Sequence, residues 1–192
     1  MSKLEVDAIE PQSGTTLTLG ASGDTVNVAA GATNNLGITM ADSWRLTTTT
    51  NYNTNADVTT NWERNDSVGY ASLGTGLTES SGIFSFPETG LYYIALQARV
   101  SMGNTETTAD FNLYVTTDNS SYNRATANST GNGATTTDVA GTLSSTFLIN
   151  VTDTSNVKFK FKTESFAALS SVTGSTTSQR TGFTILRIGD SQ

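Results

Sequence analysis

Three lysines stand at every second position of one short segment, at Lys158, Lys160 and Lys162, and apolar residues alternate with them. Because successive side chains of a strand point to opposite faces, this spacing would gather three ammonium groups on one face. Such a face could bind an anionic glycan or a carboxylate of a neighbouring subunit. An ordinary solvated strand face has the same pattern and is the commoner cause of a charge run, so both interpretations stay open.

The chain contains no histidine and no cysteine. Without histidine it lacks the usual general base at neutral pH, the Ser-His-Asp triad and the commonest zinc ligand. A pair of carboxylates could still hydrolyse a glycosidic bond. The acidic residues, however, stand singly, mostly beside Gly, Asn or Ser in predicted turns. We therefore predict that the protein is not an enzyme and that it uses no cofactor and no metal.

Charge and hydropathy exclude two kinds of partner. Lys and Arg number 10 against 17 Asp and Glu, a net charge of −7. Nucleic-acid binding depends on clustered cations, so we expect no nucleic-acid partner. The chain has no apolar run of about 18 residues, the length that a helix needs to span a bilayer, so we expect no membrane insertion. Its first residues lack the hydrophobic region of a signal peptide, which predicts synthesis in the cytoplasm.

The elements that position these residues are organised around segment 82–100, the densest apolar and aromatic run. It reads as two strands that meet at a corner, where Pro87 ends the first strand and Gly90 begins the second. One face of the second strand is predicted core, formed by Tyr92, Ile94, Leu96 and Val100. The other face contains Leu91 and Tyr93, which are too apolar for a plain solvent face. We predict that another subunit covers it.

The rest of the chain favours an all-β protein. Further strands are predicted at 43–46, 109–115, 146–151, 157–162 and 184–188. Between them lie polar stretches at 47–60, 123–138 and 170–179, which are interpreted as loops. No segment shows helical periodicity of any length. Many short strands separated by turn signals argue for a β-sandwich.

The central corner resembles the signature corner of the C1q/TNF-like jelly roll. The pattern is filled without a gap by Gly82, Phe84, Pro87, Gly90, Tyr92 and Ile94. Segment 182–186 is similar to the family's last strand, although Arg180 stands where an aromatic residue is often found. The resemblance covers residues 42–188. It implies a jelly-roll β-sandwich that assembles as a trimer and serves as a binding head.

The resemblance adds expectations about individual residues. The candidate residues of the trimer interface are Leu91, Tyr93 and Tyr114. The family's topology would place the lysine strand in the inner sheet, where its lysines would approach the trimer axis and need acidic partners. Some C1q-like heads carry calcium, which makes Asp118 and Asp153 candidate ligands. An isolated Asp beside Asn and Ser is more often a turn residue, and we predict that role for both.

Residues 1–33 form a predicted extended β arm, joined by a linker at 34–41 to a head at 42–192. The arm's two short strands offer two apolar side chains each, and the candidate attachment residues are Leu17, Leu19, Val26 and Val28. Faces this small cannot fold alone. We therefore expect the arm to become ordered in an assembly, with a disordered tail as the alternative.

Segments 2–11, 13–20 and 23–26 resemble the N-terminal arms of tail-fibre and other structural proteins of marine bacteriophages. This resemblance implies a virion protein, a homotrimeric fibre or appendage. Its arm would attach to other virion proteins, and its head would face outward toward a host-surface glycan or protein. Two alternatives share the fold: a soluble C1q-like lectin or adhesion module, and a purely architectural capsid decoration.

Overall fold

The computed structural model describes residues 9, 11, 13–15, 17–25, 37–103, 106–131, 139–166 and 170–192. The chain divides into two units, Met1–Asn35 and Leu36–Gln192. All strands of the described residues lie in the second unit, which is called the head below. Within those ranges there is no helix, and hence none that is long and apolar enough to cross a membrane.

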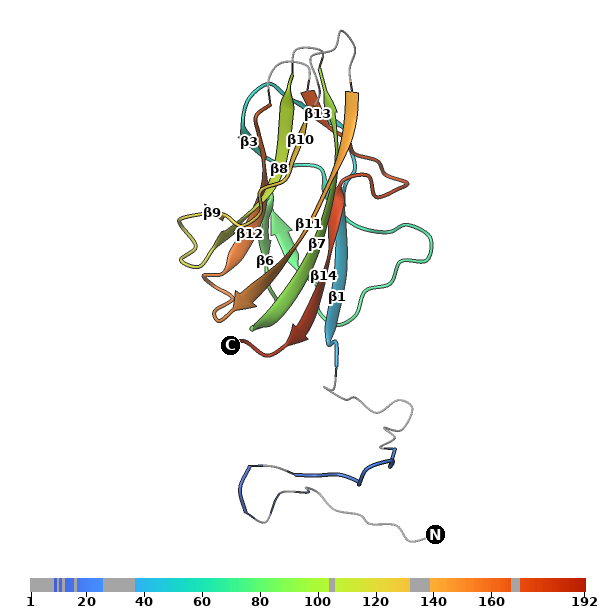
Figure 1. Ribbon diagram of the computed structural model, residues 1–192, viewed down its shortest axis with the longest axis vertical. Coiled ribbons are helices and arrows are strands. Elements are labelled where there is room, and N and C mark those ends of the chain that lie inside the picture. The colour runs from blue at the N-terminus through green and yellow to red at the C-terminus, as the bar shows by residue number, and fades with distance from the viewer. Residues whose placement is uncertain are drawn as a thin grey trace. The chain divides into compact units, whose positions relative to one another are not determined.

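In chain order the strands are β1 (Met40–Leu46), β2 (Thr50–Tyr52), β3 (Ala56–Asp57), β4 (Trp62–Arg64), β5 (Thr78–Ser80), β6 (Ile83–Ser85), β7 (Gly90–Met102), β8 (Thr108–Thr116), β9 (Asn123–Arg124), β10 (Ser129–Gly131), β11 (Val139–Val151), β12 (Lys158–Glu164), β13 (Ser170–Val172) and β14 (Gly182–Gly189). They form two antiparallel sheets (Figure 1). The first sheet has the order β2-β13-β7-β14-β1-β4, with β11 also paired to β7. The second has the order β10-β8-β12-β6-β5, with β3 paired to β12 and β9 to β8. The predicted all-β sandwich is confirmed.

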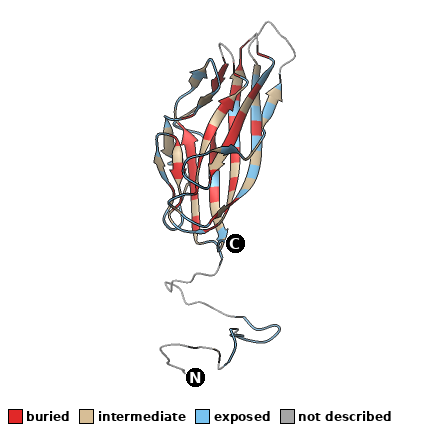
Figure 2. Ribbon diagram, turned by 90° about the vertical axis from the view of Figure 1, so that its left-hand side faces the viewer, coloured by how far each residue is buried: buried red, intermediate tan, exposed pale blue. Residues whose placement is uncertain are grey.

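Aromatic rings fill the space between the sheets. Phe84 of the second sheet stacks on Phe159 with ring centroids 5.0 Å apart, and it meets the edge of Phe183 from the first sheet at 4.9 Å. Offset and edge-to-face contacts of this kind stabilise a core beyond the burial of their area. Trp62 joins the cluster from β4, and its indole Nε1 donates to the Val58 carbonyl at 2.9 Å. Figure 2 shows buried residues, coloured red, along the strands of both sheets.

The central corner has the predicted form, with β6 leading into β7. Tyr92, Ile94, Leu96 and Val100 are all buried, so the predicted core face of β7 is correct. The Tyr92 hydroxyl donates to the Glu88 carbonyl at 2.9 Å and so ties the corner to the strand.

The glycine that opens the motif is needed for its backbone. Gly82 has a φ of 79°, a conformation that costs other residues energy. A Cβ built there would lie 2.3 Å from the Val58 carbonyl oxygen. Only glycine therefore fits this turn without a shift of the neighbouring chain.

Each of the three predicted loops contains strands. Segment 47–60 includes β2 and β3, segment 123–138 includes β9 and β10, and segment 170–179 includes β13. These strands are two or three residues long and consist largely of Thr, Ser and Asn, so they carry no alternation of apolar and polar residues. Their partners decide the structure: all of β13 is buried between β2 and β7.

Candidate functional site

The three lysines lie on the outer face of the second sheet, and two of them have partners in the same chain. Lys160 Nζ lies 2.7 Å from Asp57 Oδ2 and 4.5 Å from the centre of the Tyr122 ring. Lys162 lies over the Tyr114 ring at 5.5 Å. These contacts favour the interpretation as a solvated strand face. β12 is in the sheet opposite to that of Leu91 and Tyr93, which corrects the expectation that the lysines share the predicted trimer face.

Tyr114 is also separated from the other two candidate interface residues. It belongs to β8 of the second sheet, whereas Leu91 and Tyr93 belong to β7 of the first. Its hydroxyl donates to Glu164 Oε1 at 2.8 Å. Burial, together with this hydrogen bond, raises the pKa of Tyr114 to about 12. Tyr114 therefore does not share a surface patch of one subunit with Leu91 and Tyr93, and a common interface of all three stays a prediction.

The two candidate calcium ligands shape turns. The Asp118 carboxylate accepts hydrogen bonds from the amides of Ser121 at 2.7 Å and Ser120 at 2.9 Å, and from the Thr116 hydroxyl at 2.8 Å. These donors, the Ser121 amide first, lower the pKa of Asp118 to about 2. Asp153 accepts from the Ser155 amide at 2.8 Å. Both carboxylates thus satisfy backbone donors of the loops in which they lie, as predicted for turn residues.

The lowered pKa of Asp118 predicts a pH-dependent contribution to stability. Since the pKa falls from 3.8 to about 2 on folding, the ionised carboxylate stabilises the fold above pH 3.8, and this contribution is lost as the pH falls toward about 2. We expect the gap in unfolding free energy between wild type and Asp118→Asn to be constant near neutral pH and to shrink across that window. Urea denaturation at several pH values measures it. A gap that stayed constant down to about pH 2 would contradict the prediction.

Apolar side chains line up across the outer face of the first sheet. Leu148 pairs with Tyr93, Tyr93 with Leu186, and Leu186 with Ala41, which is bridged in turn to Leu73. Directly opposed side chains lie about 4.5–5.5 Å apart between Cβ atoms, so these five residues form a continuous apolar row. Leu148 is 52% and Leu73 48% exposed. The row includes Tyr93, one of the predicted interface residues, together with residues that the sequence did not point to.

The row widens toward one end of the sheet. Leu91 lies two residues before Tyr93 on the same face of β7 and is half-buried. Ile188 lies two residues beyond Leu186 in β14 and is exposed. A contiguous apolar surface of this kind marks an interaction site more often than scattered single residues do.

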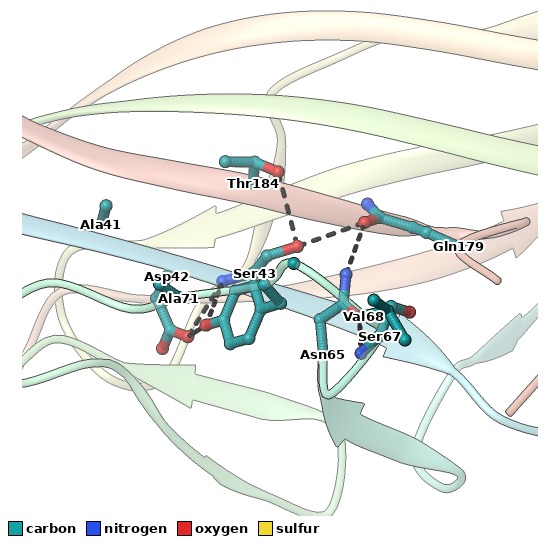
Figure 3. Close-up of a pocket in the computed structure, with 11 residues that line it drawn as sticks. Ala41, Asp42, Ser43, Asn65, Ser67, Val68, Ala71, Gln179 and Thr184 are labelled. Carbon is teal, nitrogen blue, oxygen red and sulfur yellow. Dashed lines mark hydrogen bonds between the residues drawn. The ribbon is translucent and has the colours of Figure 1, made fainter. Parts of the chain in front are cut away.

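A polar pocket of about 400 Å³ borders the row (Figure 3). The segment that follows β4 stays paired with β1 as far as Asn65, whose amide donates to the Ser43 carbonyl at 2.9 Å. It comes back to β1 at Leu73, which exchanges two hydrogen bonds of 3.0 Å with Ala41. The loop between these points, residues 65–72, forms one wall of the pocket, while Gln179 and Thr184 form the opposite wall. The full lining is Ala41, Asp42, Ser43, Asn65, Ser67, Val68, Gly69, Tyr70, Ala71, Gln179 and Thr184.

Hydroxyl and amide groups are linked across this pocket. Gln179 Oε1 accepts from the Ser43 hydroxyl and from Asn65 Nδ2, each at 3.2 Å. The Thr184 hydroxyl donates to Ser43 Oγ at 3.4 Å. These bonds fix the orientation of the Gln179 amide. Its Nε2 donates to no group in the described part of the chain, so this donor is available to a ligand.

A buried carboxylate fixes one end of the loop. Asp42 is 1% exposed and accepts from the Leu77 amide at 2.9 Å, from Trp44 Nε1 at 3.0 Å and from the Tyr70 hydroxyl at 3.0 Å. Arg64 adds a bidentate contact, Nε to Oδ1 at 3.0 Å and Nη2 to Oδ2 at 3.2 Å. The Asp42 side chain thus connects β1 to loop 65–72 and to the segment around Leu77.

A buried guanidinium fixes the other end. Arg45 is fully buried on the outer face of β1, where the loop covers it. It donates to the Ser67 hydroxyl and to Glu63 Oε1, both at 2.6 Å, and it pairs with Asp66. The sequence showed β1 as an ordinary first strand. Nothing in its pattern indicated that Asp42 and Arg45 would be buried, because most of their partners lie about 20 residues or more further along the chain.

The arm residues are only partly described. Leu17 and Leu19 are 43% and 58% exposed. Val26 and Val28 lie outside the described residues. The described apolar side chains of the arm therefore remain open to a partner.

Comparison with known proteins supports the fold. No family model and no curated protein sequence matches the chain. Among solved structures it is similar to Eiger TNF from S. frugiperda, with a TM-score of 0.61 and 11% identity over 81% of this chain and 96% of that one. It is also similar to murine APRIL in a crystal at pH 8.5, with a TM-score of 0.55 and 12% identity over 78% of this chain and 98% of that one. At this identity the likeness shows the fold alone, and the predicted TNF-like jelly roll is confirmed.

Proposed function

We propose that the protein is a homotrimeric virion protein of a bacteriophage, a fibre or appendage. Its N-terminal arm attaches to other virion proteins, and its jelly-roll head faces outward. The observation that carries the proposal is the distribution of apolar surface. The head has a complete core and still exposes the apolar row, while the arm exposes Leu17 and Leu19. Another subunit would cover the apolar row, and another virion protein would cover the leucines of the arm.

The apolar row supports the trimer. Four of its five residues belong to strands of the first sheet, and none of the five is charged. Copies of this face that meet around a symmetry axis can therefore cover it without burying an unpaired charge. Homo-oligomers usually close by symmetry, which leaves no copy of the row exposed. The resemblance of the corner motif to C1q/TNF-like heads favours three copies.

The arm supports the attachment role. Ordering a chain segment costs about 1–2 kcal/mol per residue, which two leucines cannot offset alone. A partner that covers Leu17 and Leu19 would supply the missing burial. The resemblance of segments 2–11, 13–20 and 23–26 to phage structural arms favours a virion protein as that partner.

A second candidate function is favoured by the polar pocket. A C1q-like lectin or adhesion module needs a ligand site on the head, and the pocket between loop 65–72 and Gln179 has the composition of one. A purely architectural decoration protein would need no such site. If the protein is a virion fibre, the same pocket would lie beside the proposed subunit interface, because Ala41 belongs both to the apolar row and to the pocket lining.

Deletion of residues 1–33 tests the attachment role. We expect the truncated head to fold and to remain trimeric but to be absent from purified particles, as measured by mass spectrometry. The double variant Leu17→Asp/Leu19→Asp should give the same loss because charges replace both apolar contacts. Val68→Asp is the control, since it places a new carboxylate at a fully exposed apolar residue of the head and should leave the copy number unchanged. A truncated protein at full copy number on virions would overturn the attachment role.

A further inference from the structure

We propose that the pocket between loop 65–72 and β14 binds one neutral sugar residue of a carbohydrate. Its ligand groups would be the Gln179 amide and the hydroxyls of Ser67 and Thr184. The inference rests on the proposed outward-facing head and names the class of ligand that the head would recognise. The site itself is built within a single chain.

The size of the pocket limits the ligand. Its volume of about 400 Å³ is at the lower end of the range of about 300–1,000 Å³ for ligand pockets. A single six-membered sugar ring suits this space, whereas a folded peptide segment needs a longer groove. Within the described lining, Tyr70 is the aromatic side chain and Val68 the branched apolar one, and a sugar offers C–H groups that can pack against such surfaces.

The hydrogen-bonding groups match a polyhydroxylated ligand. Hydroxyls of Ser and Thr both donate and accept, as sugar hydroxyls do. Gln179 Oε1 is held by Ser43 and Asn65, and Figure 3 shows the Gln179 nitrogen pointing away from both partners. The amide therefore presents a fixed donor whose orientation does not have to be set on binding.

The charges around the pocket select against an anionic ligand. Asp42 is paired with Arg64, and Arg45 is paired with both Glu63 and Asp66. Three carboxylates thus face two guanidinium groups, an excess of one negative charge. The described lining includes no lysine or arginine. With a chain charge of −7, these groups favour a neutral sugar over a sialic acid or a phosphate.

The walls of the pocket are fixed before a ligand arrives. Asp42 and Arg45, both buried, hold the loop at Tyr70 and Ser67 respectively. Buried charges of this kind are costly to desolvate, and an apolar contact would hold a loop at lower cost. What they provide is a defined geometry. A site that is already ordered loses less entropy on binding and so binds more tightly.

An array of defined oligosaccharides, neutral and sialylated, probed with the labelled full-length protein, tests the proposal. We expect binding to glycans that end in a neutral residue, and a loss of at least about tenfold for Gln179→Ala and for Thr184→Ala. Thr146→Ala is the matched control: Thr146 and Thr184 flank Ala95 on the same exposed sheet face, but only Thr184 lines the pocket. This control should bind like wild type.

Three results would overturn the proposal: no glycan bound, sialylated glycans bound in preference to neutral ones, or Gln179→Ala binding as strongly as wild type. Light scattering on the same samples measures the oligomeric state, so the pocket and the proposed trimer are tested separately. A trimer that binds no glycan refutes the pocket and leaves the trimer intact. A monomer that binds neutral glycans through Gln179 supports the pocket and refutes the trimer.

Discussion

Replacing Asp42 with alanine should lower the free energy of unfolding by about 3–5 kcal/mol, the range seen when one member of a buried ion pair is removed. The carboxylate is buried, and the Leu77 amide and Trp44 Nε1 each lose their acceptor in the variant. Arg64 is 44% exposed and can turn toward water, which limits the loss. Urea denaturation at neutral pH measures the change.

A second aspartate gives the matched control. Asp57 also forms an ion pair, with Lys160 at 2.7 Å, but its side chain is 39% exposed. Exposed pairs contribute about 0–1 kcal/mol because water and salt screen them. Asp57→Ala should therefore cost far less than Asp42→Ala. Equal losses in the two variants would mean that the network around Asp42 does not hold the loop against β1.

The contrast between these aspartates also shows which kind of feature cannot be predicted from the sequence. Segment 82–100 could be interpreted correctly because its signals are local: the alternation around Tyr92, the proline and the two glycines act within a few residues. Burial of Asp42 depends on Arg64, Tyr70 and Leu77, which lie about 20–35 residues away along the chain. No periodicity reports such distant partners, so the pocket could not be predicted.

Alternation fixes the face of a strand but not the sheet to which the strand belongs. The alternation correctly predicted that the side chains of Tyr93 and Tyr114 point away from the core, yet β7 and β8 lie in opposite sheets. For the same reason, the alternation of the lysines does not indicate the sheet to which β12 belongs. The apolar row depends on register as well, since Leu148, Leu186 and Ala41 come together only through the pairing of four strands. Sequence periodicity contains neither piece of information.

Tyr93→Arg is expected to convert the trimer into a monomer. Tyr93 lies within the apolar row, between Leu148 and Leu186. An arginine there would place an unpaired charge in the proposed interface of every subunit, at several kcal/mol per buried ion. Light scattering at micromolar concentration should return about three times the 20.2 kDa chain mass for wild type and about that mass for the variant.

Tyr114→Arg makes the same chemical change on the opposite sheet and serves as the control. Its new guanidinium would lie on the outer face of the second sheet, near Glu164 but also near Lys162 and Arg124. The control should keep the trimeric mass. Circular dichroism should show that both variants remain folded, because both side chains lie outside the core. A wild-type protein of monomeric mass, or a Tyr93→Arg protein that stayed trimeric, would show that the apolar row does not join the subunits.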